Sequence, residues 1–211
     1  MVRSRRGWRV RGCDRGGLFF AYNGTPLSSN DSNPSKASDL IHYLGSVGSY
    51  SNPATNGVIT VATSSVFSAA GAGTVTTDRV VNPTLASQNW YPNNQANSWI
   101  AWEFPANFAP TSLLIQTSGV SGNPFHLRSF ELRYSSDLTN ALTSASPVAT
   151  WTQGTTWANQ TQISTLGAWY SFPTTGMPLA RRWAIRVPGL DSGGGNYPTL
   201  AEVNWFGDYR G

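Results

Sequence analysis

The stretch Leu200-Ala201-Glu202-Val203-Asn204-Trp205-Phe206-Gly207, close to the C-terminus, alternates polar and apolar residues and ends at a glycine. A period of two is typical of a half-buried β-strand, because successive side chains point to opposite faces. The stretch therefore predicts a short strand that is closed by Gly207.

Four further motifs precede this strand, in a definite order. They are Trp99-Ile100-Ala101-Trp102-Glu103-Phe104, Phe130-Glu131-Leu132-Arg133-Tyr134-Ser135-Ser136-Asp137, the single Trp151, and Arg182-Trp183-Ala184-Ile185-Arg186-Val187. Together with the closing E-x-x-x-F-G, this order resembles that of the discoidin, or coagulation-factor type C, family, over about residues 58–207. The resemblance implies a galactose-binding-like jelly roll that binds sugars, lipid head groups or proteins through its loops and catalyses nothing. It also implies that Trp99 and Trp205 are core residues.

Strand patterns recur along the chain between clusters of turn residues, which indicates an all-β sandwich. In residues 130–135, Phe130, Leu132 and Tyr134 take one face while Glu131 and Arg133 take the other. Eight strands are predicted, as suits a jelly roll. Their ranges are residues 58–64, 98–104, 112–117, 130–135, 148–152, 168–172, 182–187 and 201–206.

The length of 211 residues suits one sandwich with an N-terminal extension. Residues 1–17 are predicted to be a basic arm, residues 18–57 a connector, and residues 58–211 the sandwich. The connector holds one predicted short helix, with Ser38 as its N-cap and Gly45 as its stop. Some intracellular relatives of the discoidin type carry a segment similar to Ile41–Gly45.

The net charge of +4 is concentrated in the arm. Residues 1–15 hold six arginines and one aspartate, so they carry +5 and the remainder carries −1. A nearly neutral body has no basic surface for nucleic acid, and we expect no specific binding of nucleic acid by it. The arm is either a solvated leader without a fold or a contact for phosphates, lipid head groups or an acidic neighbour.

The cysteine count and the hydropathy of the sequence bear on disulfide formation, membrane insertion and secretion. Cys13 is the single cysteine, so no intrachain disulfide can form. No apolar run is long enough for a transmembrane span, and the apolar residues 18–22 are fewer than a signal-peptide core contains. We therefore do not expect secretion by the usual route.

The sequence contains few side chains of the types that act in catalysis. His42 and His126 are the only histidines, and one cysteine with two distant histidines makes no tetrahedral zinc set. Glu103, Glu131 and Glu202 all lie within predicted strands, where a glycosidase pair is not expected. The sequence predicts that the protein is not an enzyme.

No cofactor is expected apart from calcium, which the resemblance raises as an open question. Many bacterial relatives hold a structural calcium ion with an Asp in the loop after the first strand and with the Glu of the closing motif. Glu202 matches that Glu, whereas the Asp-Gly of the loop is missing and only Asp78 or Asn82 stands near its place. Calcium takes about six to eight oxygen ligands, so this set is thin support.

Polar loops that also carry aromatic residues form the predicted binding surface. Residues 88–97, 118–128, 155–160 and 191–197 combine rings that stack on a sugar with side chains that hydrogen-bond its hydroxyls. For Trp90, a position in the core is an equal alternative to a ligand contact. The candidates are Trp90, Tyr91, Asn93, Asn94, His126, Arg128, Trp157, Asn159 and Tyr197.

These observations predict a non-catalytic binding and assembly module with weak carbohydrate binding. We expect a phage or virion component, such as a tail fibre, a tailspike accessory or a capsid decoration. Its partners would be other virion proteins in an oligomer, and a cell-surface glycan. One alternative is a cytoplasmic domain whose loops bind a polypeptide. Another is a peripheral membrane binder that inserts Trp90 and Tyr91.

Overall fold

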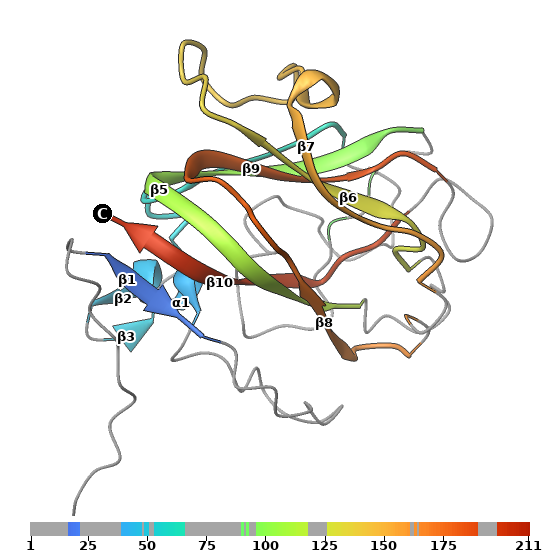
Figure 1. Cartoon of the computed structure of the whole chain (residues 1–211), viewed down its shortest axis with the longest axis horizontal. Coiled ribbons are helices and arrows are strands. Elements are labelled where there is room, and N and C mark those ends of the chain that lie inside the picture. Colours follow the sequence, from blue (N-terminus) through green and yellow to red (C-terminus); the bar gives the residue numbers. More distant parts are fainter. Residues whose placement is uncertain are drawn as a thin grey trace, which may run out of the picture.

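One long strand, β5 (Ser98–Gln116), runs through both layers of the molecule (Figure 1). The computed structural model describes residues 17–21, 39–47, 49–50, 53–65, 90, 92, 96–117, 126–160, 163, 165–189 and 198–211. The first half of β5 pairs with β4 (Thr60–Thr63) and β9 (Ala180–Val187). Its second half pairs with β8 (Trp169–Pro173) and β10 (Glu202–Arg210). The register with β9 shifts between Glu103 and Phe108, where Pro105 lies and lacks a backbone donor.

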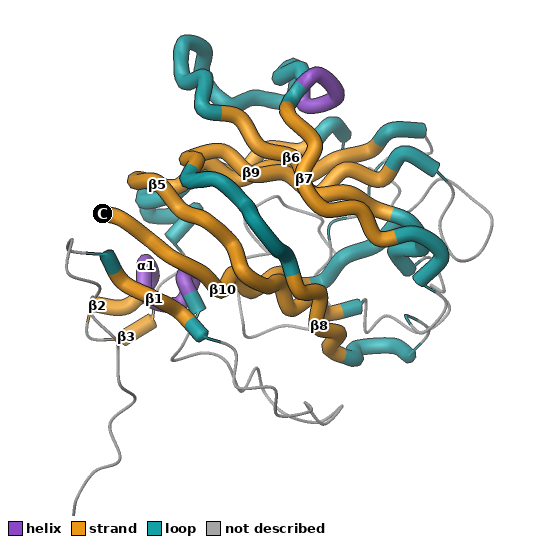
Figure 2. The backbone as a smooth tube through the Cα atoms, viewed as in Figure 1, coloured by secondary structure: helices purple, strands orange, loops and turns teal. Residues whose placement is uncertain are grey.

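The remaining strands extend the two layers, and the pairings between the named strands of the described residues are all antiparallel. Beyond β9 lie β6 (Phe130–Ser135) and then β7 (Thr152–Trp157), whereas β1 (Leu18–Phe20) extends the other layer beyond β10. The predicted all-β sandwich is thus confirmed. Figure 2 shows the two layers of strands, with the connection between β6 and β7 above the upper layer.

Most strands lie where the sequence predicted them, with two corrections. The strands predicted at residues 98–104 and 112–117 are the two halves of β5, because the chain bends between them without leaving the sheet. The strand predicted at residues 148–152 is wrong. Val148–Thr150 form a 3-10 helix, and β7 begins at Thr152 and continues to Trp157.

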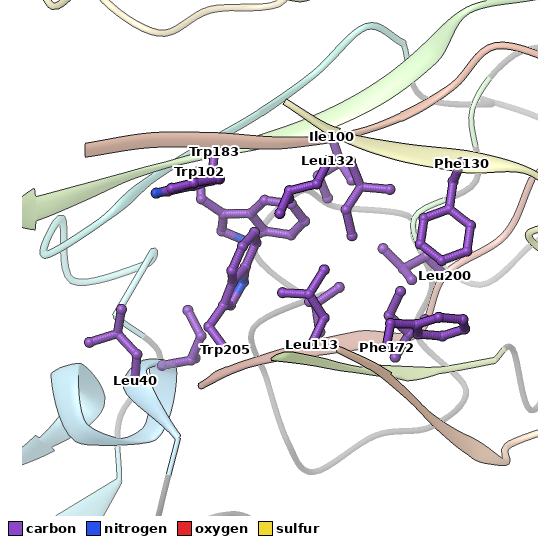
Figure 3. Packing of buried hydrophobic residues seen from close by; sticks show 14 of the residues in the cluster. Leu40, Ile100, Trp102, Leu113, Phe130, Leu132, Phe172, Trp183, Leu200 and Trp205 are labelled. Atoms are coloured by element: carbon purple, nitrogen blue, oxygen red, sulfur yellow. The ribbon is translucent and has the colours of Figure 1, made fainter. Parts of the chain in front are cut away.

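The core lies between the two layers and is rich in tryptophan. Trp102 and Trp183 come from the layer of β5 and β9, and Trp205 comes from β10 to meet them (Figure 3). All three are fully buried, and the rings of Trp102 and Trp205 meet edge to face with centroids 5.1 Å apart. The indole N–H of Trp183 donates to the carbonyls of Phe108 and Ala180, both at 3.1 Å. The predicted core position of Trp205 is confirmed.

A second apolar cluster lies on the outer face of the layer that contains β9. Trp99 and three small residues, Ala62, Ala101 and Ala184, form its floor, and the connection between β6 and β7 covers them. Leu142, Val148 and Trp151 of that connection supply the cover. Trp99 is therefore buried as predicted, in this outer cluster and not between the layers.

Two arginines hold the covering connection in place. Arg182 donates to the backbone carbonyls of Asp137 and Asn140, and its Nε donates to Glu103 at 2.9 Å. Arg133 donates to the carbonyls of Ala149 and Trp151, both at 2.7 Å. Because these guanidinium groups satisfy carbonyls at both ends of the connection, the cover is fixed to the sheet.

The predicted connector contributes to the folded body. β1 pairs with the end of β10 from Leu18 opposite Tyr209 to Phe20 opposite Gly207. Helix α1 (Leu40–Gly45) buries Leu40 and Ile41 in the main core and ends at the predicted Gly45. The short strands β2 (Ser46–Val47) and β3 (Ser49–Tyr50) pair with each other. The folded body thus reaches back beyond residue 58, whereas residues 1–16 and Ser38 lie outside the described residues.

Helices are short throughout the described ranges, and none has the length and apolar character that crossing a bilayer requires.

Candidate functional site

Four connections emerge at one end of the layer formed by β5, β9, β6 and β7. Ser98, the first residue of β5, lies opposite Val187, the last residue of β9. Phe130, the first residue of β6, lies opposite Trp157, the last residue of β7. The segments that precede β5 and β6 and those that follow β7 and β9 therefore share this end, on the right in Figure 1. These are the four loops that the sequence marked, so the structure brings their bases together.

Trp157, at this end of the layer, is an aromatic residue that packs on the core. It is partly exposed, and its ring stacks on Phe130 with centroids 4.9 Å apart and an interplanar angle of 30°. Phe172 meets the same ring edge-on at 5.6 Å. A ring that the core holds on one side loses little conformational freedom on binding, which suits it to stack on a sugar.

Arg128 and Asn159 lie beside Trp157 and are exposed. The backbone N–H of Gln160 donates to the carbonyl of Arg128 at 2.7 Å, and the N–H of Asn159 donates to Ser129 Oγ at 3.0 Å. These two bonds join the connection before β6 to the one after β7. Guanidinium and amide groups at such a place are suited to hydrogen-bond hydroxyls.

Backbone strain is concentrated at the same end. Asn97 has φ of 63° and Asn159 has φ of 51°, and within the described ranges no other residue except glycine has a positive φ. Asparagine adopts this left-handed conformation more readily than most residues. Such conformations cluster at ligand-binding sites, where the surrounding structure must hold them in place.

Two predicted contact residues are buried, which corrects their assignment. Trp90 is fully buried, pairs through its backbone with Leu200, and donates its indole N–H to Ser65 O at 3.3 Å. The core position, one of its two alternatives, is the observed one. His126 is 3% exposed and forms a β-bridge with Thr199. Neither side chain is exposed, so neither ring is open to a ligand at the surface.

The other predicted contacts, Tyr91, Asn93, Asn94 and Tyr197, lie outside the described residues, as do Asp78 and Asn82 of the predicted calcium site. Of that site only Glu202 is described. It is 4% exposed, lies opposite Gln116, and accepts a hydrogen bond from Asn204 Nδ2 at 3.4 Å. The described ranges contain no group of three or more His, Cys, Asp or Glu arranged to hold a metal ion.

Calcium binding thus stays a prediction. If Glu202 belongs to a calcium site, EDTA lowers the Tm, added CaCl2 restores it, and Glu202→Gln removes this response.

A network of charged residues next to the candidate surface was not among the predicted site residues. Arg133 Nε donates to Glu131 Oε1 at 2.6 Å, and Arg186 donates to the same oxygen and to Asn97 Oδ1. The side chain of Glu131 is only 6% exposed. The alternation in β6 and β9 was the available signal, since it places Glu131, Arg133 and Arg186 on one face.

The pKa of Glu131 reflects these contacts. Burial alone would raise the pKa, but the hydrogen bonds and positive charges of Arg133 and Arg186 outweigh it and hold the pKa below the ordinary value of a glutamate. Glu131 is thus a carboxylate at neutral pH, with two arginines to balance it.

Comparison with known proteins identifies similar folds but no close relative. No family model and no curated protein matches the sequence. A carbohydrate-binding module from Clostridium perfringens, solved with GalNAc-β-1,3-galactose, has a TM-score of 0.54 at 14% identity, over 71% of this chain and 96% of that one. A fucolectin from striped bass, Morone saxatilis, has a TM-score of 0.51 at 17% identity, over 71% and 45%.

A chitosan-binding module from a chitosanase/glucanase of Paenibacillus sp. IK-5 has a TM-score of 0.50 at 13% identity, over 71% of this chain and 96% of that one. At these identities the likeness concerns the fold alone. Together with the antiparallel strands and the ordered motifs, it shows that this chain has the jelly-roll sandwich fold that the two modules and the fucolectin share.

Proposed function

We propose that this chain is a non-catalytic carbohydrate-binding module whose sugar contacts lie at the end of the sandwich where Trp157 emerges. The observation that carries the proposal is the partly exposed ring of Trp157, fixed against Phe130 and flanked by the exposed Arg128 and Asn159. An aromatic face next to hydrogen-bonding side chains is the combination that recognises a pyranose ring.

The similar folds support the same class of ligand. The Clostridium perfringens module was solved with GalNAc-β-1,3-galactose, and the Paenibacillus module is described as chitosan-binding. Those ligands belong to those proteins, and they define the first probes for this one. We propose a neutral or amino sugar as the ligand, because the described surface offers one ring with donors and acceptors on its rim.

An array of β-galactosides, GalNAc-terminated glycans and chitosan oligomers tests this proposal. We expect weak binding to at least one class, with a Kd of about 0.1–1 mM, as suits one small surface. Trp157→Ala should abolish the signal, because the stacking face is lost. Tyr43→Ala is the matched control, since Tyr43 is an aromatic residue 47% exposed on α1, which packs on β10 near Tyr209. Binding to no glycan, or equal binding by Trp157→Ala, contradicts the proposal.

The place of the module in a cell or particle is a separate matter. A role in a virion, where repeated copies would add avidity to a weak site, stays a prediction, and so do its cytoplasmic and membrane-surface alternatives. The copy number of the protein in purified particles distinguishes the first from the second. Sedimentation with anionic vesicles tests the third.

A further inference from the structure

A chain of polar contacts runs across the outer face of β9, β6 and β7, next to the candidate surface. Glu131 lies at its centre and accepts from two arginines, as described above. From there Arg133 Nη2 donates to Gln153 Oε1 at 3.3 Å, and Gln153 Nε2 donates to Thr156 Oγ1 at 3.0 Å. The root network, as we call it, consists of Asn97, Arg186, Glu131, Arg133, Gln153 and Thr156.

The members of the root network lie at the bases of all four connections. Asn97 immediately precedes β5, and Arg186 is the last residue but one of β9. Glu131 is the second residue of β6, and Thr156 is the last residue but one of β7. These β9, β6 and β7 residues are direct neighbours, since Glu131 lies opposite both Arg186 and Thr156. One carboxylate is therefore linked to the base of every loop around the candidate surface.

Burial makes the links strong and mutually dependent. The side chains of Glu131, Arg133 and Arg186 are 6%, 12% and 15% exposed. Charge-assisted hydrogen bonds in such surroundings are stronger than neutral ones. Removing the carboxylate charge leaves two guanidinium groups facing each other without compensation, so the change reaches Asn97 on one side and Gln153 on the other.

The network also explains how Asn97 keeps its conformation. Its φ of 63° is unfavourable for a residue with a side chain, and Arg186 binds its Oδ1. Without that contact, nothing else described holds the Asn97 side chain in this orientation. Arg186 therefore connects the strained end of one loop to the carboxylate that organises the others.

We propose that Glu131 and Arg186 are positioning residues, which lock the bases of the four loops into one rigid unit and thereby pre-organise the sugar-binding surface. The consequence for sugar rests on the function proposed above, whereas the locking itself is a property of the free protein. Rigid placement raises affinity because less freedom is lost on binding. A second ion-pair cluster allows a fair comparison. Glu103 accepts from Arg181 and Arg182 on the same face, at the far end of the same strands.

The test compares Glu131→Gln with Glu103→Gln, which removes the same charge at the opposite end. Hydrogen–deuterium exchange of the free protein is followed in residues 96–99, 126–131, 156–160 and 186–189. In Glu131→Gln we expect exchange in all four segments to rise by at least about threefold, because their shared link is weakened. In Glu103→Gln these segments should exchange as in wild type. Arg186→Lys keeps the charge but loses the simultaneous contact with Glu131 and Asn97, so its exchange rates should resemble those of Glu131→Gln.

Glycan binding gives the second readout. Glu131→Gln should weaken binding to the glycan that wild type prefers by about tenfold, equivalent to about 1.4 kcal/mol, while Glu103→Gln leaves it unchanged. The proposal is overturned if the four segments exchange as in wild type, if Glu103→Gln loosens them equally, or if they loosen without any loss of affinity. If wild type binds no glycan at all, the proposed function fails, and the exchange data still decide whether the network locks the loop bases.

Discussion

Gly207 shows how one residue sets the geometry of the closing strand. The register between β10 and β5 shifts between Phe206 and Gly207, and Gly207 has φ of 156°. A Cβ atom at this position would lie 2.1 Å from the carbonyl oxygen of Ala109 and 2.8 Å from Pro110 Cα. Both contacts are with backbone, so the neighbouring strand would have to move. The glycine that ends the closing motif is thus a requirement of close strand approach.

We therefore expect Gly207→Ala to lower the free energy of unfolding by at least about 2 kcal/mol, from overpacking and strain combined. Urea denaturation measures this loss. Gly189→Ala is the control, because no atom of the described residues lies within 4 Å of its added Cβ, and its effect should stay within about 0.5 kcal/mol. Equal stability of the two variants would contradict the close approach of Gly207 to the backbone of Ala109 and Pro110.

The lowered pKa of Glu131 predicts how the stability of the protein depends on pH. Because its pKa in the folded protein lies below the ordinary value of a glutamate, the folded state holds this proton more weakly than the unfolded chain does. Its contribution to stability is therefore complete above the unfolded pKa and is lost as the pH falls through the folded pKa. Wild type should lose more stability than Glu131→Gln between about pH 6 and about pH 3.

Denaturation at a series of pH values measures that difference. Asp137, whose pKa is lowered mainly by hydrogen bonds with Thr139, is present in both proteins and cancels in the comparison. Parallel pH curves for wild type and Glu131→Gln would show that the arginines do not lower the pKa of Glu131.

At the scale of elements, the connection between β6 and β7 acts as an added cover for the sheet. It buries Leu142, Val148 and Trp151 against alanines on the outer face, and the arginines of β6 and β9 hold its carbonyls. Arg182 and Arg186 of β9 thus have defined partners. Arg182 fastens this cover, and Arg186 belongs to the root network.

Replacing Arg182 by Ala should lower the free energy of unfolding by about 3 kcal/mol, because Glu103 loses a close partner and two carbonyls lose their donor. Limited proteolysis should then cut between residues 136 and 150. Arg210→Ala provides the comparison, since the Arg210–Asp208 pair is on the surface and should contribute at most about 1 kcal/mol. A stable, protease-resistant Arg182→Ala protein would show that the connection between β6 and β7 stays on the sheet without Arg182.

At the scale of the whole molecule, β5 joins the two layers, and β1 with α1 extends the body along β10. Residues 1–17 contain no periodic apolar pattern, so their deletion should leave the Tm nearly unchanged. A fall of more than about 5 °C would show that the arm is part of the fold. Deleting residues 1–21 is the informative comparison, because it also removes β1 and uncovers the edge of β10, and it should lower the Tm clearly.

Local sequence patterns predicted most of the strands of this protein. The alternation around Val203 and Trp205, and that around Phe130 and Leu132, is a property of neighbouring residues, and it correctly separated core from outer face. The turn residues between such runs indicated where chains reverse. For the same reason the polar segments of the candidate surface were recognisable before their arrangement in space, although Trp157, which was predicted to lie in a loop, is the last residue of β7.

Burial within the connections depended on the tertiary structure, because it is decided by what packs over a residue and not by its neighbours in sequence. Trp90 and His126 both come from polar segments, yet Trp90 lies in the main core and His126 is only 3% exposed. The link from Asn97 through Arg186 to Glu131 joins residues up to 89 positions apart, so no local period encodes it. The sequence by itself determined the strands, their inner faces and the loops between them. Only the folded sheet, by placing strand ends side by side, decided which loops meet and which charges hold them together.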